Sequence, residues 1–280
     1  MEDNAFLPIT DPKEIKALLA ELPLVVNEDQ FVDLVTGFPR RYLLNTPRLE
    51  LVKHFLLLQG LLNQTAISSI SREGDGEHWT LVLATRDRGS LFASVSGTLS
   101  CFGASIHSAE GFANRVGLGL DIFQFQDPDG LFEDSAQREK TQEYIEAISQ
   151  NYESFENEFC HRWNRSGAVD TATISVVIDN ESHPTASHLR FQGPDHFGLL
   201  FVLSRLLMER DHVIEVASIS TLGDQVRDDF YITQHGEKIG TKEVLVVSKG
   251  LQISMEELLS HRQEISTIFS KGGWIENLWV

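Results

Sequence analysis

The chain has little cysteine, few basic residues and no long hydrophobic run, and each shortage excludes a class of protein. Cys101 and Cys160 are the two cysteines in 280 residues, too few for a disulfide framework and without a Cys-x-x-Cys pair. Lys and Arg number 23 against 41 Asp and Glu, so the formal net charge is −18. Clustered cations bind phosphate backbones and anionic membranes. We therefore expect neither nucleic acid nor a membrane as a partner.

Catalytic and targeting signals are scarce as well. The longest apolar stretches, 55–62 and 197–208, are too short to cross a bilayer, and residues 1–20 lack the pattern of a secretory signal. There is no Gly-x-Ser-x-Gly elbow and no histidine pair at zinc-helix spacing. Asp127-Pro-Asp129 has the spacing of a metal pair, but Gly130 after it favours a turn. We expect a cytoplasmic protein that is not an enzyme, with no cofactor and no bound metal.

What the chain does contain is an internal repeat. When the chain is aligned with itself at a displacement of 108 positions, Asp87 matches Asp195 and the following residues align without a gap. The other identical pairs are Leu91/Leu199, Ser96/Ser204, Leu99/Leu207, Ile106/Ile214, Ala109/Ala217, Asp121/Asp229 and Gln126/Gln234. Chance similarity between two amphipathic segments is the alternative interpretation.

Both copies show the same alternation of strand and helix signals. Leu91, Val95 and Leu99 have the spacing of one buried helix face, and Gly223-Asp224 between two β-rich runs indicates a hairpin. In the first copy we predict strands at 80–84, 105–112, 117–126 and 173–179 and helices at 91–102 and 135–162. In the second we predict strands at 187–191, 213–222, 225–234 and 274–280 and helices at 199–210 and 254–269, with an extra strand at 243–248.

This order predicts an α+β fold of two ferredoxin-like βαββαβ units. Right-handed crossovers give each unit a four-stranded antiparallel sheet with both helices on one face, and the two sheets could join into one. Residues 1–73 form a mainly helical extension, with helices at 13–22 and 48–62, and the units occupy 74–180 and 181–280. The apolar face of the second of these helices is predicted to comprise Leu49, Val52, Phe55, Leu56 and Leu62.

Six segments, mostly at turns and strand ends, carry a resemblance to known proteins. They are Thr85-Arg-Asp-Arg-Gly-Ser-Leu-Phe92, Asp121-Ile-Phe-Gln-Phe-Gln-Asp-Pro-Asp-Gly130, Ile178-Asp-Asn180, Gly193-Pro-Asp-His-Phe-Gly-Leu-Leu-Phe201, Asp229-Phe-Tyr-Ile-Thr233, and Phe38-Pro-Arg-Arg-Tyr-Leu-Leu-Asn-Thr-Pro47 with His54. At these residues the chain resembles the ACT family of regulatory domains. It is more closely similar to the C-terminal tandem ACT region of the bacterial uridylyltransferases that modify the PII nitrogen-signalling protein, over roughly residues 38–270. Motifs of that enzyme's nucleotidyltransferase and His-Asp hydrolase domains do not occur in the sequence.

Neither copy keeps the family's Asp-Arg-Pro-Gly turn intact. The first has Asp87-Arg88-Gly89-Ser90 and the second Asp195-His196-Phe197-Gly198, with glycine in the family's position. A glycine there allows close backbone approach, and the N–H groups of a helix start favour a carboxylate, so the second copy is the better candidate pocket. The ligand-binding residues expected from the resemblance are Asp195, His196, Gly198, Leu199, Ile214, Ala217, Asp87, Arg88, Gly89 and Ile106.

The resemblance implies a non-catalytic protein that senses a small metabolite, with glutamine as the first ligand to test. Asp195 would receive the ligand's ammonium group, and N–H groups near Gly198 its carboxylate. The alternatives are an interaction module without a ligand, and a regulatory part of a PII uridylyltransferase system. The expected partners are an amino acid and a regulatory protein or a second copy of the chain.

Overall fold

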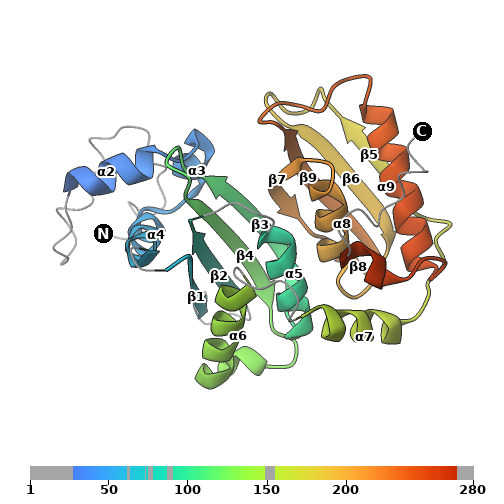
Figure 1. The fold of residues 1–280 in the computed structure, drawn as a ribbon, viewed down its shortest axis with the longest axis horizontal. Helices are drawn as coiled ribbons and strands as arrows, with labels where there is room; N and C mark the ends of the chain where they lie inside the picture. Colours follow the sequence, from blue (N-terminus) through green and yellow to red (C-terminus); the bar gives the residue numbers. More distant parts are fainter. Residues whose placement is uncertain are drawn as a thin grey trace.

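The chain folds around one antiparallel sheet (Figure 1). The structure is a computed structural model and describes residues 28–61, 64–72, 74, 78–86, 91–148 and 155–269. Within this part of the chain the sheet has nine strands in the order β1-β2-β4-β3-β7-β9-β6-β5, with β8 paired to β9. The strands are β1 (Ala66–Arg72), β2 (His78–Thr85), β3 (Ser105–Ala113), β4 (Gly119–Gln126), β5 (Ser175–Asp179), β6 (Ser187–Pro194), β7 (His212–Ser218), β8 (Thr221–Leu222) and β9 (Gln225–Gln234). The predicted α+β class is confirmed.

Helices cover the sheet in two equivalent sets. On the inner face, α5 and α6 cover the first half-sheet (β1, β2, β4 and β3), while α8 and α9 cover the second (β7, β9, β6 and β5). In Figure 1, α7 runs below the second half of the molecule, from beside the end of α5. The helices are α2 (Glu28–Thr36), α3 (Arg40–Asn45), α4 (Arg48–Gly60), α5 (Leu91–Cys101), α6 (Ser135–Ile148), α7 (Glu156–Ser166), α8 (Leu199–Met208) and α9 (Val244–Leu259), with 3-10 turns η2 (Leu131–Glu133) and η4 (Ile265–Phe269). No helix of the described residues is long and apolar enough to span a membrane.

The two halves meet at β3 and β7 around an approximate twofold axis. Ala109 pairs with Ala217, and these alanines are also repeat equivalents, because 109 plus 108 is 217. Helices α5 and α8, which correspond in the repeat, pack against each other behind this seam. Equivalent surfaces therefore face each other, as at the interface of a symmetric dimer, but within one chain. The expectation that the two sheets join is confirmed.

Each unit has its outer strand at the beginning rather than at the end. The segment 173–179 was predicted to close the first copy, which is wrong: β5 pairs with β6, for example Val176 with Phe191, and so belongs to the second half-sheet. In the first half, β1 holds the corresponding place beside β2. Ala66, Ser68 and Ile70, each two residues apart, form the buried face of β1. The unit boundaries stay a prediction, and the strand expected at 274–280 lies outside the described residues.

Three predictions about the inner layer differ from the structure. The segment 243–248 is not an extra strand but begins α9, where Val247 is buried and Ser248 Oγ donates to the carbonyl of Val176 on β5 (2.6 Å). Packing against the sheet overrides the β preference of its branched side chains. The helix expected at 135–162 is α6 and α7, and the one expected at 254–269 is the end of α9 followed by η4.

The N-terminal helices α2 to α4 pack on the opposite, outer face of the first half-sheet. Phe31, Tyr42 and Phe55 are buried there against Val82 and Leu120. The helix predicted at 48–62 is confirmed by α4, although its buried face is different. Leu49 and Leu56 are 51% and 40% exposed, and Leu51 and Leu58 are buried in their place. The helix predicted at 13–22 lies outside the described residues.

Candidate functional site

A cavity of about 220 Å³ lies where β3 and β7 stop pairing. The two strands pair through Ser108, Ala109 and Glu110, and past this point residues 111–113 of β3 and 212–215 of β7 line opposite sides of the cavity. Its remaining lining comes from the end of β2, the first turn of α5, the end of α8, the start of β4 and Pro39. One water occupies about 30 Å³ of liquid, so this volume suits a small metabolite rather than a large ligand.

Gly111 allows the walls of the cavity to come close together. A Cβ on this residue would lie 3.1 Å from Asp121 Oδ1 and 3.3 Å from the carbonyl oxygen of Ile214. The glycine therefore lets β3 approach β7 while the Asp121 carboxylate stays at the cavity wall.

His212 lines the cavity and carries a buried acceptor. Its side chain is 3% exposed, and Nδ1 lies 3.3 Å from the carbonyl oxygen of Leu207. Because a carbonyl can only accept, Nδ1 carries the proton and donates. Burial lowers the pKa of His212, so the ring is neutral and Nε2 presents a lone pair. Nε2 is buried and has no hydrogen-bond partner among the described residues.

Two carboxylates line the same cavity, and one of them is paired with an arginine. Asp121 enters from β4 and Glu215 from β7. Glu215 is held by Thr233, whose Oγ1 donates to it at 3.1 Å, and by an ion pair with Arg41 from α3. Arg41 also donates to the carbonyl of Gly111 and lies over the ring of Phe112 (4.3 Å). Arg41 thus connects the N-terminal helices to both half-sheets at the cavity.

The turn predicted as the second copy's pocket lies at the exit of β6. Asp195 is exposed and its backbone N–H donates to the carbonyl of Asp224 (2.8 Å). Gly198 is the N-cap of α8 in a left-handed conformation (φ 71°), and Leu199 is the buried first residue of that helix. His196 is buried, with Nδ1 3.0 Å from the carbonyl oxygen of Phe197 and Nε2 3.1 Å from that of Gly167. Burial lowers its pKa, so the neutral ring can donate to one of these oxygens.

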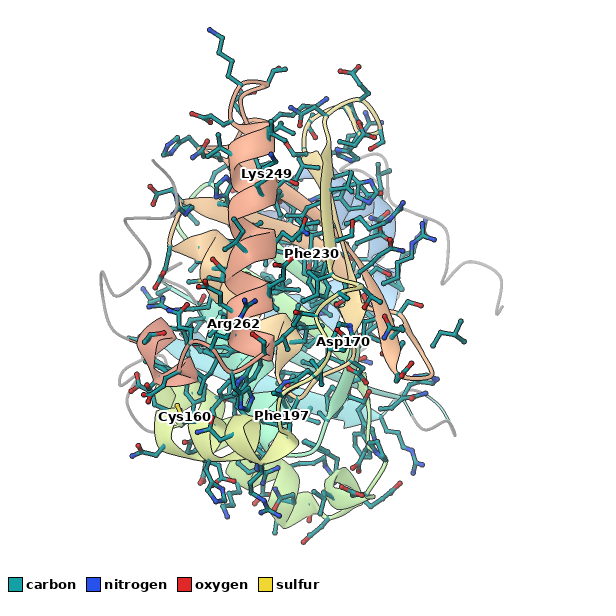
Figure 2. The ribbon with its side chains drawn as sticks, turned by 90° about the vertical axis from the view of Figure 1, so that its right-hand side faces the viewer. Cys160, Asp170, Phe197, Phe230, Lys249 and Arg262 are labelled. Carbon is teal, nitrogen blue, oxygen red and sulfur yellow. The ribbon has the colours of Figure 1, made fainter. Side chains whose placement is uncertain are left out.

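An aromatic ring from α7 fills the space beside this turn. A Cβ on Gly198 would lie 2.5 Å from Cε2 of Phe159, and the Phe159 ring packs 4.4 Å from that of Phe201. Figure 2 views this region, with Phe197 lying over α7. The sequence made the second copy the better candidate pocket, but here the glycine accommodates a ring of the chain itself. The cavity lies on the first copy's side instead.

The other predicted ligand residues are divided between the cavity and the seam. Ile214 lines the cavity beside Thr85 and Leu91, apart from the turn of the second copy. Ala217 is fully buried at the seam, and Ile106 is half-buried on β3 opposite Phe125. Asp87, Arg88 and Gly89 lie outside the described residues.

Strand pairing corrects the repeat alignment after the hairpin. Gly111 and Leu83 flank Asp121 in the first half-sheet. In the second, Phe191, which corresponds to Leu83, pairs with Asp228. The structural counterpart of Asp121 is therefore Asp228, not Asp229, because the second hairpin is one residue shorter. A single gap in the alignment would have shown this, whereas His212 and Glu215 carry no motif by which sequence reasoning could have found them.

The Asp-Pro-Asp-Gly segment forms the turn that was predicted for it. The Asp127 carboxylate accepts backbone N–H groups of Leu131 (2.9 Å) and Phe132 (2.6 Å), and Gly130 has a φ of 68°. Within the described ranges, no group of three His, Cys, Asp or Glu side chains is placed to hold a metal ion.

No protein-family model matches the chain, but it is similar to part of a class of bacterial enzymes. A bifunctional uridylyltransferase/uridylyl-removing enzyme of Caulobacter vibrioides (strain NA1000 / CB15N) is 28% identical over 183 residues, 63% of this chain and 19% of that enzyme. The enzyme of the same name from Azospirillum brasilense is 30% identical over 151 residues (52% and 16%), and that of Rhodospirillum rubrum 25% over 226 (79% and 24%). The chain spans about a fifth of the length of these relatives. The predicted resemblance to the uridylyltransferases is confirmed.

Proposed function

We propose that the chain is a regulatory region of a uridylyltransferase-type system and binds one small amine-bearing metabolite, an amino acid such as glutamine. The observation that supports this is the cavity between β3 and β7, which is lined by the acidic residues Asp121 and Glu215 and by His212. The tandem ACT character, the ligand and the absence of catalysis are all parts of this proposal.

The polar groups of the cavity fit an amino acid better than an acid without an amine. Glu215 is already paired with Arg41, so the Asp121 carboxylate is the group that would attract a cation, and the buried His212 ring in the cavity wall has an unused lone pair. An ammonium group supplies both the charge and three donors. The first turn of α5, which begins at Leu91 in the cavity wall, offers N–H groups for the ligand's carboxylate. We propose this polarity for the bound ligand.

The competing function is an interaction module, and one observation favours it. The outer face of the first half-sheet is covered by α2 to α4, whereas Val177 and Val213 are exposed on the outer face of the second. A protein partner or a second copy of the chain could cover this face. Co-purification of a stable partner whose binding no amino acid affects would select this function.

Titration calorimetry separates the two functions. The wild-type chain is titrated with each of the twenty amino acids at millimolar concentration, and we expect one of them to bind with a stoichiometry of one. Asp121→Asn keeps the shape of the cavity and removes a charge, and His212→Phe removes the acceptor. Each should weaken binding at least tenfold, about 1.4 kcal/mol. Asp229→Asn, on the outer face, is the matched control. No heat from any amino acid would overturn the proposal.

A further inference from the structure

The approximate twofold axis predicts a second space equivalent to the cavity. The cavity lies between the first turn of α5 and the end of α8, with Leu91 on one side and Met208 on the other. Exchanging the two units gives a space between the first turn of α8 and the end of α5. Gly198 is the N-cap of α8 and Cys101 is the last residue of α5, so these residues mark the equivalent position.

Helix α7 passes through this second space. It packs against α5, and its Phe159 ring lies against Gly198 and the rings of Phe197 (5.2 Å) and Phe201 (4.4 Å). Two contacts fix its far end: the Trp163 ring lies 4.1 Å from that of His196, and His196 Nε2 is 3.1 Å from the carbonyl oxygen of Gly167. The first unit has a cavity at the related place. The second differs from it in the presence of α7 and in Ile219, which takes the place of Gly111 and whose N–H donates to the carbonyl of His107 on β3 (2.9 Å).

The second space retains the acidic group of the first. Asp228 is the counterpart of Asp121 and faces inward, but it is only 1% exposed. Its Oδ1 accepts the backbone N–H of Ser220 at 3.4 Å, and its Oδ2 has no partner among the described residues. A buried carboxylate with one unpartnered oxygen is costly, and burial raises the pKa of Asp228 to about 7. An apolar residue would be more stable here, so Asp228 indicates a missing cationic partner.

We propose that the space between α8 and α5 is a second binding site for the same class of amine-bearing ligand, closed by Phe159 of α7. This inference rests on the proposed function of the first cavity. The ring and the ligand compete for the same volume, so a chain with α7 in place binds one ligand and a chain with α7 displaced binds two. Asp228 receives the second ligand's ammonium group, as Asp121 does in the first cavity.

The test removes the ring and counts the bound ligands. Phe159→Ala is compared with Phe155→Ala, a matched control, because Phe155 also belongs to this aromatic cluster and is buried but lies against Gly97 rather than Gly198. Glutamine and methylammonium are titrated into each full-length variant by calorimetry. We expect a stoichiometry of one for wild type and Phe155→Ala, and of two for Phe159→Ala. Should Phe159→Ala fail to fold, Phe159→Leu opens the site partially.

A second readout needs no ligand. Carboxyl NMR follows the titration of Asp228, which should move toward the ordinary aspartate range in Phe159→Ala, as water reaches it, and stay in place in Phe155→Ala.

The outcomes separate this inference from the proposed function. If wild type binds one ligand and a folded Phe159→Ala still binds one, the second site is refuted and the first stands. If only Phe159→Ala binds, the second site is supported and the first is refuted. If neither protein binds, or if the titration of Asp228 is the same in all variants, the inference is overturned.

Discussion

Asp228→Asn should stabilise the protein, and the gain should grow with pH. The folded-state pKa of Asp228 is about 7, raised by burial, against about 3.9 in an unfolded chain. A raised pKa means that the folded state holds its proton more tightly, so this group favours folding in acid and opposes it increasingly as pH rises from about 4 toward 7. From pH 5 to pH 8 the two pKa values imply that this one group lowers the free energy of unfolding by about 2 to 3 kcal/mol.

The asparagine keeps an acceptor for the N–H of Ser220 and cannot ionise. Its advantage over wild type in urea unfolding should therefore be about 2 to 3 kcal/mol greater at pH 8 than at pH 5, or roughly 5 °C in melting temperature. Asp229→Asn is the control: although partial burial raises the pKa of Asp229, its bonds with His188 (2.6 Å) and Arg190 (2.8 Å) lower it overall. The Asp229 carboxylate stabilises the fold at any pH above the pKa that Asp229 has in the unfolded chain. Asp229→Asn should therefore not raise the free energy of unfolding at pH 8. An equal advantage of Asp228→Asn at both pH values would refute the reasoning.

Three other variants test the elements around the cavity. Gly111→Ala should lower the free energy of unfolding, measured in denaturant, by about 1 to 3 kcal/mol, because the added Cβ would press on the Ile214 carbonyl and on Asp121. Unchanged stability would mean that β3 and β7 are less closely packed. Arg41→Met should lower the free energy of unfolding by about 2 kcal/mol, because it removes the bonds to Glu215 and to the Gly111 carbonyl. A lower melting temperature would confirm this, and an unchanged one would contradict it. Burial lowers the pKa of His54 in the folded chain to about 4, below its value of about 6.5 in an unfolded chain. The neutral ring therefore contributes its full stabilisation above about pH 6.5, and this stabilisation is lost as pH falls toward 4. His54→Phe should flatten this acid limb of the stability curve, and an unchanged limb would contradict the assignment.

The repeat and its periodicities predicted most of the fold. Apolar spacing located α5 and α8, and Gly223-Asp224 located the hairpin of β8 and β9, where Gly223 has a φ of 66°. Ala109 and Ala217, which the 108-residue displacement aligns, also pair with each other where β3 meets β7. What sequence could not decide was which half each outer strand joins. β5 lies midway between the units in the chain, and only pairing with β6 assigns it to the second.

The site was harder to predict because it depends on how the units pack. Gly198 in a helix-start turn suggested a ligand, but the residue that fills its space, Phe159, comes from a helix far away in the chain. In the same way, the cavity combines Asp121 of one unit with His212 and Glu215 of the other. No local motif joins these residues. They come together through the twofold arrangement and through the asymmetric course of α7.

The most direct test of the account is to map glutamine binding by the backbone amide shifts of the isotope-labelled chain. The account predicts that glutamine perturbs the amides of Thr85, Phe92, residues 111–113 and residues 212–215, in one saturable process. Perturbations confined to the outer face of the second half-sheet, or none at millimolar glutamine and with any other amino acid, would contradict it.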